Sequence, residues 1–156
     1  MPPCYLGRVA ALDFQFIRGG VLLPQLGLWL DPQERQIGRE RVFVSHAHSD
    51  HTGRHREVIL TEPTARLMQA RLGGRRIEHR LRFGERREFA HDDLPFHLTL
   101  LPAGHILGSA MAFVEVGGKS LLYTGDFKLK PGLTAEPCAP CRADILIMET
   151  TFGRPK

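Results

Sequence analysis

The feature that most constrains this chain is a run of metal-capable side chains, H-A-H-S-D-H, at positions 46–51. The run directly follows Arg41–Ser45 (R-V-F-V-S), whose β-branched and aromatic residues predict a buried strand. His46 and His48 alternate along the chain, so their rings can point the same way, and a turn at Ser49 brings the next aspartate and histidine to a second position. Imidazole and carboxylate groups suit zinc, manganese or iron, and open sheets place ligands at strand ends. The run therefore predicts a metal site at the end of a strand.

Two further candidate ligands also follow predicted strands. His105 lies in L-P-A-G-H-I-L-G-S-A, just past the predicted strand Pro95–Leu101, and the glycines around it give a tight loop. Asp126 lies in L-L-Y-T-G-D-F, just past the predicted strand Lys119–Thr124. Either residue alone would more often be structural. All three segments, however, share the same order: an apolar strand, a small residue and then a candidate ligand. As a set, they favour a metal site with more ligands than one ion needs.

The rest of the sequence predicts an α/β fold with more strand than helix. Thr61 is a suitable cap for a helix over Glu62–Leu72, because Pro63 lies in its first turn and two glycines follow its end. The other expected strands are Leu12–Ile17, Val21–Leu23, Val58–Leu60, Ile77–Phe83, Ala110–Val116 and Ala143–Met148, with a short apolar run at Leu28–Leu30. No repeat or linker divides the 156 residues, so they predict one domain.

Composition excludes several classes of protein. Apolar residues make up 42% and charged residues 24%, which is ordinary for a soluble globular protein and excludes disorder over the whole length. No apolar run approaches the roughly 18 residues of a membrane span, and the first residues do not read as a secretory signal. Three cysteines cannot all pair, and a chain of this size needs no disulfide, so a reducing cytoplasm is the expected compartment.

The positive charge of the chain is uneven. The net charge is +4, and eight arginines lie between Arg66 and Arg87. Arginine grips phosphate well because its planar guanidinium binds two oxygens at once. The segment therefore has two interpretations: a contact for nucleic acid, with Arg71, Arg75 and Arg76 as candidates, or a solvated face of a helix and turn.

Four motifs in order resemble the metallo-β-lactamase fold superfamily: H-A-H-S-D-H, A-G-H-I-L-G-S-A, Y-T-G-D-F and, at positions 147–153, I-M-E-T-T-F-G. The last is similar to the E-S-T-[YF]-G signature of the nucleic-acid branch, the β-CASP nucleases. The phrase E-P-C-A-P-C-R-A-D before it resembles the bacterial ligase-associated DNA exonucleases of that branch. The resemblance spans Asp31 to Gly153. It implies an αββα sandwich, of which this chain would be the first half, with mixed or antiparallel sheets and few helices.

The resemblance also implies a site for two divalent metal ions, zinc first and manganese or iron as alternatives. The ligands would be His46, His48 and His105 for one ion, Asp50 and His51 for the other, and Asp126 as a bridge. Asp31 would support the ligand loop, or it is a plain turn residue before proline. Glu149 would handle protons beside the ligands, or it is a strand-end carboxylate. Glu149 then completes the expected catalytic set with Asp50 and Asp126.

The activity implied is hydrolysis of phosphodiester bonds in DNA or RNA by water that two metal ions activate. Nucleic acid is the expected partner, a DNA ligase or repair complex a further one, and no membrane partner is expected. Two alternatives stay open: a small-molecule hydrolase of the same fold, such as a thioesterase or lactonase, and an inactive fragment or non-catalytic subunit. The loop around His105 and the E-T-T-F-G motif favour the nuclease, and the presence of all six ligands argues against long decay.

The family pattern also predicts what these residues lack. Its second metal ion takes a further histidine from the C-terminal half of the fold, and the β-CASP insert supplies another for the leaving group. Neither has a place in residues 1–156, so we expect the N-terminal part of a longer enzyme, without the insert and the C-terminal half. Catalysis by these residues alone is then expected to be feeble.

Overall fold

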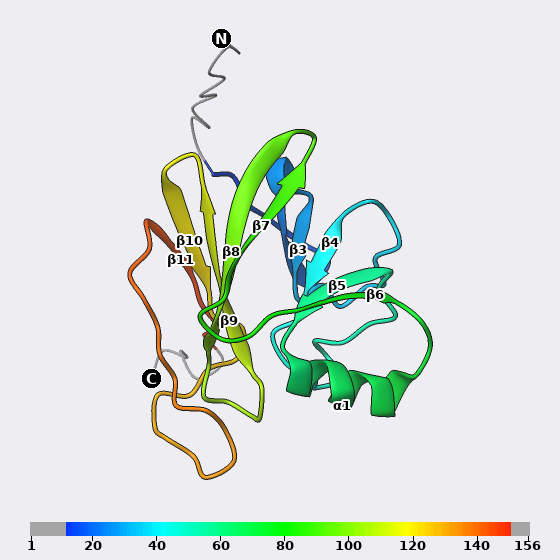
Figure 1. Ribbon diagram of the computed structural model, residues 1–156, viewed down its shortest axis with the longest axis vertical. Coiled ribbons are helices and arrows are strands. Elements are labelled where there is room, and N and C mark those ends of the chain that lie inside the picture. The colour runs from blue at the N-terminus through cyan, green and yellow to red at the C-terminus, as the bar shows by residue number, and fades with distance from the viewer. Residues whose placement is uncertain (1–11, 151–156) are drawn as a thin grey trace.

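The computed structural model describes residues 12–150, which form two β-sheets packed face to face with helix α1 (Glu62–Leu72) on the outer face of the first sheet (Figure 1). The first sheet has the strand order β1 (Gln15–Ile17), β2 (Gly20–Leu23), β3 (Leu28–Leu30), β4 (Arg41–Phe43), β5 (Glu57–Leu60) and β6 (Ile77–Arg80). The second has the order β11 (Ile145–Ile147), β10 (Lys119–Tyr123), β9 (Ala110–Val116), β8 (Leu94–Pro102) and β7 (Arg86–His91). A 3-10 turn, η1 (Pro24–Leu26), joins β2 to β3. The α/β class and the layers expected of a metallo-β-lactamase-like half are confirmed.

The directions of the strands determine where the candidate site residues that follow them leave each sheet. In the first sheet, β1, β2 and β3 pair antiparallel, whereas β3, β4, β5 and β6 pair parallel. In the second sheet every pair is antiparallel except β10 with β11. Because β3 and β4 run in the same direction, Asp31 and the run at 46–51 leave the sheet at the same edge.

The main core lies between the two sheets and follows the two-residue period of the strands. On β4, Phe43 belongs to the cluster between the sheets, whereas its neighbour Val42 belongs to the cluster under α1. On β8, the fully buried Leu98 and Leu100 alternate with partly exposed residues and join the same core as Phe43. Each buried side chain of this size contributes about 2 kcal/mol, so the sheet-to-sheet contact is the main source of stability.

Helix α1 begins and ends where the sequence predicts. Thr61 Oγ1 accepts the N–H of Thr64 at 3.4 Å, and Gly73 ends the helix with a φ of 56°. Thr61 Oγ1 also donates to the carbonyl of Gly108 at 2.7 Å, which ties the start of α1 to the loop between β8 and β9. No helix in residues 12–150 is long and apolar enough to cross a membrane.

Strand β7 is the element that the sequence analysis missed. Its segment, R-R-E-F-A-H, has Phe89 as its only large apolar residue, so no alternation of apolar and polar residues marks it as a strand. β7 pairs with β8 at the edge of the second sheet, through a turn in which Asp92 and Asp93 have φ of 44° and 65°. The strands predicted over Leu12–Ile17, Ile77–Phe83 and Ala143–Met148 are shorter in the structure, at β1, β6 and β11.

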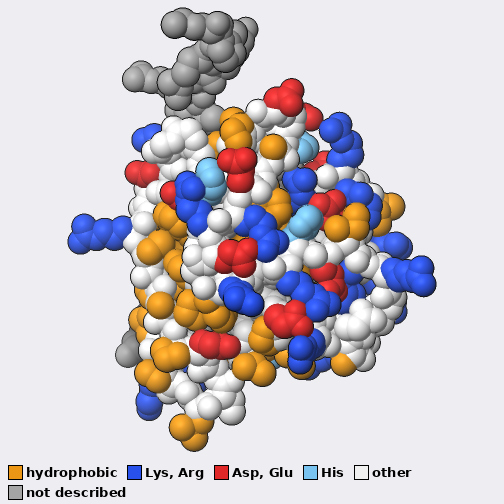
Figure 2. Space-filling view, in the orientation of Figure 1, with side chains coloured by type: hydrophobic (Ala, Val, Ile, Leu, Met, Phe, Trp, Pro, Cys, Tyr) orange, Lys and Arg blue, Asp and Glu red, His pale blue; other side chains and the backbone are white. Residues whose placement is uncertain are grey.

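The surface divides into a charged and an apolar part. Figure 2 shows Lys and Arg side chains, interleaved with acidic ones, over β4, β5, β6 and α1, and hydrophobic side chains beside β10 and β11. Most arginines of the region 66–87 have a carboxylate partner: Arg66 and Arg80 pair with Glu62, Arg76 with Glu78, Arg86 with Glu115 and Arg87 with Glu85. Ion pairing therefore accounts for much of this arginine cluster.

Candidate metal centre

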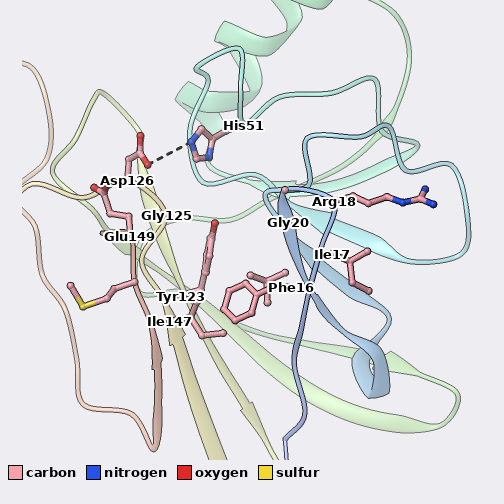
Figure 3. Close-up of a pocket in the computed structure, with 13 residues that line it drawn as sticks. Phe16, Ile17, Arg18, Gly20, His51, Tyr123, Gly125, Asp126, Ile147 and Glu149 are labelled. Carbon is pink, nitrogen blue, oxygen red and sulfur yellow. Dashed lines mark ion pairs between the residues drawn. The ribbon is translucent and has the colours of Figure 1, made fainter. Parts of the chain in front are cut away.

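The predicted ligands come together at one edge of the two sheets. His46, His48 and His51 follow β4, His105 lies in the loop between β8 and β9, and Asp126 follows β10. In Figure 3, His51 faces Asp126 across the site, and Glu149 lies beside Asp126. The N–H of Ala110 donates to the carbonyl of Ser45 at 2.8 Å, which joins the first sheet to the second beside these ligands.

Three histidines form the inner part of the site. His46 Nε2 lies 3.0 Å from His48 Nδ1, which lies 3.2 Å from His105 Nε2. With a carboxylate oxygen of Asp126, one ligand atom from each of these residues lies within 4.8 Å of all the others. His46 is fully buried, whereas the other three are partly exposed. The four side chains therefore surround one small volume that is accessible from solvent.

Asp126 directs its two oxygens to different neighbours. Its Oδ2 lies 3.7 Å from His46 Nε2 and 3.6 Å from His105 Nε2. Its Oδ1 lies 3.6 Å from His51 Nε2, and the same nitrogen lies 3.6 Å from Asp50 Oδ2. Asp126 therefore faces His46 and His105 with one oxygen and His51 with the other.

The chemistry of this donor set fits a divalent transition-metal ion. Ser45 Oγ lies 2.9 Å from His46 Nδ1, so the Nε2 of that ring is left to face the cluster. Burial lowers the pKa of His46 to about 3 and also lowers the pKa of His105, so both rings are neutral at pH 7 and keep a lone pair. Three imidazoles and a carboxylate that converge on one point are typical ligands of zinc.

Asp31 connects the ligand loop to both sheets. This buried residue has a φ of 46°, an unusual conformation for an aspartate at a strand end. Its Oδ1 accepts the N–H of Ser45 at 2.8 Å, and its Oδ2 accepts the hydroxyl of Tyr123 at 3.1 Å. The same Oδ2 lies 3.1 Å from His51 Nδ1. Burial acts to lower the pKa of His51, but Asp31 and the nearby carboxylates outweigh it and raise that pKa.

Tyr123 and Gly125 are site residues that sequence reasoning missed. Burial and the charge of Asp31 raise the pKa of Tyr123, so its hydroxyl stays protonated and donates to Asp31. Gly125 has a φ of 53°, and a Cβ on it would lie 2.6 Å from Ser45 Cβ. A tyrosine at the end of a strand, directly after two leucines and two residues before a glycine, was the available signal.

Glu149 lies just after β11 and next to Asp126. Its Oε1 accepts the N–H of Phe127 at 3.2 Å. Burial and, to a smaller extent, the charge of Glu149 raise the pKa of Asp126. Both carboxylates line a pocket of about 360 Å³ whose apolar wall includes Phe16, Tyr123 and Ile147 (Figure 3). The pocket is therefore open to a substrate beside the ligands.

The loop that carries His105 is shaped by its glycines, as the sequence predicts. Gly104 and Gly108 have φ of 77° and 75°, and a Cβ on Gly108 would lie 2.6 Å from Pro63 Cβ. Ser109 Oγ accepts the N–H of His105 at 3.0 Å. Close packing on α1 and this internal hydrogen bond hold the imidazole toward the other ligands.

The three candidate nucleic-acid contacts lie in different environments. Arg71 donates to the carbonyl of Ala47 inside the ligand run. The side chain of Arg76 is 4% exposed, and its Nε lies 2.9 Å from a carboxylate oxygen of Glu78. Arg75 is exposed. Arg76 therefore has a structural contact, and Arg71, although exposed, supports the ligand run, whereas Arg75 is exposed without such a contact.

The buried histidines predict that the metal-free chain loses stability in mild acid. Burial lowers the pKa of His46 to about 3 and that of His55 to about 4, from an ordinary value of 6.5. Below pH 6.5 the unfolded chain therefore binds more protons than the folded chain, and each histidine lowers the free energy of unfolding by up to ~1.4 kcal/mol per pH unit until its folded pKa is reached. Urea titrations in the presence of a chelator, at several values between about pH 7.5 and about pH 5, measure the decrease in the free energy of unfolding.

A variant separates this effect from general acid sensitivity. His55→Gln removes one titrating group, so the stability of the variant should depend less steeply on pH than that of the parent chain. Equal pH dependence in the two proteins would contradict the environment assigned to His55.

Comparisons with known proteins give relatives for most of the chain. Residues 40–151 match the family model described as "Metallo-beta-lactamase superfamily". The chain is 56% identical over 137 residues to "Probable DNA ligase" of Opitutus terrae, covering 87% of this chain and 13% of that protein. It is 33% identical over 139 residues to "RNase J-like protein" of Methanocaldococcus jannaschii, covering 74% and 32%. It is also 33% identical over 147 residues to "5' exonuclease Apollo" of Gallus gallus, covering 87% and 31%. The chain thus spans less than a third of the length of each of these relatives.

Proposed function

The chain belongs to the metallo-beta-lactamase superfamily, and from this membership we propose that it forms the N-terminal, metal-binding part of a nuclease that hydrolyses phosphodiester bonds. The resemblance to the nucleic-acid branch of the superfamily is confirmed by the relatives. The observation that carries the proposal is the position of Asp126, whose two oxygens face separate groups of ligand atoms.

The fold implies divalent metal binding, and we assign the ligands of this chain from their geometry. One ion would be held by His46, His48 and His105, a second by Asp50 and His51, with Asp126 between them. We propose zinc as the ion, because imidazole is the main donor. A bound pair of such ions lowers the pKa of water toward about 7 and stabilises charge on the attacking and leaving oxygens.

The residues around the ligands have separate tasks in this proposal. Asp31 orients His51, and the hydroxyl of Tyr123 in turn fixes the carboxylate of Asp31. Glu149, with Oε1 on the N–H of Phe127, stands where it can exchange a proton with water near Asp126. The pocket wall of Ile147 and the exposed ring of Phe16 offers apolar surface on which a base can rest.

We propose DNA as the substrate. The relative that matches 87% of the chain at 56% identity has a name that refers to DNA, which favours DNA over RNA and a DNA ligase as the functional partner. The proposal is tested by comparing the cleavage of DNA and RNA strands of the same sequence by the protein that carries this chain. Cleavage of RNA alone would contradict the choice of DNA but not the metal-dependent hydrolysis.

A single substitution tests the metal site directly. His48→Ala should remove most of the zinc that elemental analysis finds in the purified protein, because His48 Nδ1 lies between the other two imidazoles. The matched control is His97→Ala, since His97 lies on β8 beside Glu88, outside the cluster. Zinc content that is unchanged in His48→Ala, or equally reduced in both variants, would refute the ligand assignment.

A further inference from the structure

A second polar cavity lies at the C-terminal end of α1, outside the proposed metal ligands. It has a volume of about 380 Å³, and we call it the arginine basin. Its charged and titratable lining consists of Arg35, Arg54, His55, Arg56, Arg75 and Arg76, and no acidic residue lines it. Residues 35, 54 and 75 are far apart in sequence, so the fold brings together positive charges that no linear motif shows.

Two of the five arginines already have carboxylate partners. Arg76 lies 2.9 Å from Glu78 and also donates to the carbonyl of Gly73 at 3.3 Å. Arg56 Nη2 lies 3.0 Å from a carboxylate oxygen of Glu57. These two side chains are explained by local structure, because they neutralise acidic residues and, for Arg76, the negative end of α1.

The other three arginines have no such explanation. Arg35, Arg54 and Arg75 are exposed, and none lies within ion-pair distance of a carboxylate among residues 12–150. Arg35 Nε donates to the carbonyl of Arg54 at 2.8 Å, which fixes the base of one guanidinium and leaves its outer nitrogens available. Gly74 leaves room for Arg54, whose Nη1 would lie 3.5 Å from a Cβ at position 74. Like charges gathered without counter-charges favour an anion.

His55 adds an independent observation. It is 2% exposed, and its Nδ1 accepts the N–H of Gln36 at 3.1 Å. Burial lowers the pKa of His55 to about 4, so the neutral ring at pH 7 carries its proton on Nε2. That nitrogen is buried and has no hydrogen-bond partner within the described part of the chain. A buried donor without an acceptor costs about 1–3 kcal/mol, which a ligand oxygen would recover.

We propose that the arginine basin binds a phosphate group of a nucleic-acid strand, away from the bond that is cleaved. Arg35, Arg54 and Arg75 supply the charge, and His55 at the wall of the basin has a buried Nε2–H that a small movement of the ring would turn toward a phosphate oxygen. The inference rests on the proposed function for the identity of the strand, but the basin contains none of the proposed metal ligands. The proposal places the electrostatic contact with the strand in the arginine basin rather than along the whole region 66–87.

The experiment compares two double variants that remove the same charge. Arg54→Gln with Arg75→Gln removes two basin arginines, whereas Arg82→Gln with Arg142→Gln removes two exposed arginines outside the basin. Binding of a fluorescent single-stranded DNA is measured by anisotropy at several salt concentrations, in metal-loaded protein with a hydrolysis-resistant phosphorothioate strand and again with a chelator. The basin variant should bind roughly tenfold more weakly at low salt, and its salt slope should fall by about 1 to 1.5. The control should change binding by less than about twofold.

Equal losses of affinity in the two double variants would overturn the proposal, as would unchanged binding in the basin variant. Calorimetry with inorganic phosphate distinguishes the source of the ligand. If phosphate binds the parent chain and not the basin variant while DNA affinity is the same in both, the basin takes a free anion and the strand contact is wrong. Failure of the nuclease proposal would be seen in a different measurement. Metal-dependent cleavage would be absent from the parent protein, whatever the binding curves of the two double variants show.

Discussion

Asp126→Asn is expected to lower metal-dependent cleavage of DNA by more than about 100-fold, the largest effect typical of a residue that only orients a ligand. The amide keeps the shape of the side chain but removes the negative charge that faces His51 on one side and His46 and His105 on the other. It also replaces one oxygen by an NH₂ group that cannot bind a cation. Turnover at saturating zinc, with metal content by elemental analysis, measures both consequences.

The matched control for this variant is Asp92→Asn. Asp92 is exposed in the turn between β7 and β8, and asparagine tolerates its φ of 44°. Both substitutions remove one negative charge, but only the change at Asp126 should impair turnover while circular dichroism stays unchanged. Full turnover in Asp126→Asn would mean that this residue is structural and that the two groups of ligand atoms work independently of it.

Gly125→Ala is expected to lower the free energy of unfolding by about 3 kcal/mol, a combination of left-handed strain and overpacking. Gly125 has a φ of 53°, and the new Cβ would lie 2.6 Å from Ser45 Cβ and 2.7 Å from Ser45 Oγ. Relief requires Ser45 to move, although its N–H is bound to Asp31 and its Oγ lies against His46. Urea unfolding measures the loss, and a weaker affinity for zinc should accompany it.

Gly118→Ala separates strain from crowding. Gly118 also has a positive φ, 78°, but a Cβ there would meet nothing within 4 Å. This control should therefore lower the free energy of unfolding by only about 1 kcal/mol, which is the strain of a left-handed conformation for a residue with a Cβ. If both variants lose the same stability, the contact between Gly125 and Ser45 is looser than the structure shows.

The extent to which the fold was predictable depends on how local each signal is. Helix α1 was predicted at its observed bounds because Thr61, Pro63 and Gly73 act within one turn of its ends. β7 was not predicted, because an edge strand with one buried residue, Phe89, has no visible alternation of apolar and polar residues. β11 is shorter than predicted, and Leu146 within it is 56% exposed, since apolar residues alone do not show which face of an edge strand is covered.

The same distinction applies to the site. Imidazole and carboxylate groups at strand ends were visible in the sequence, and the structure brings His46, His48, His105 and Asp126 within 4.8 Å of one another. What the sequence left open was Asp31, whose role as a turn residue or a support was undecided until its contacts were known. The hydrogen bond between Tyr123 and Asp31, and the approach of Arg35 and Arg54 to Arg75, join segments that are distant in sequence, and no pattern in a single sequence shows such contacts.

The candidate ligands come from both sheets, and this has a consequence for how long the protein survives degradation. An ion held by His46 of the first sheet and by His105 and Asp126 of the second would act as a cross-link between the two layers. Binding that requires the folded arrangement adds to its stability, by about 2.7 kcal/mol when free metal exceeds the dissociation constant 100-fold. A chain made when metal is scarce would then open more often and be degraded sooner. Metal supply would set the amount of this protein as well as its activity.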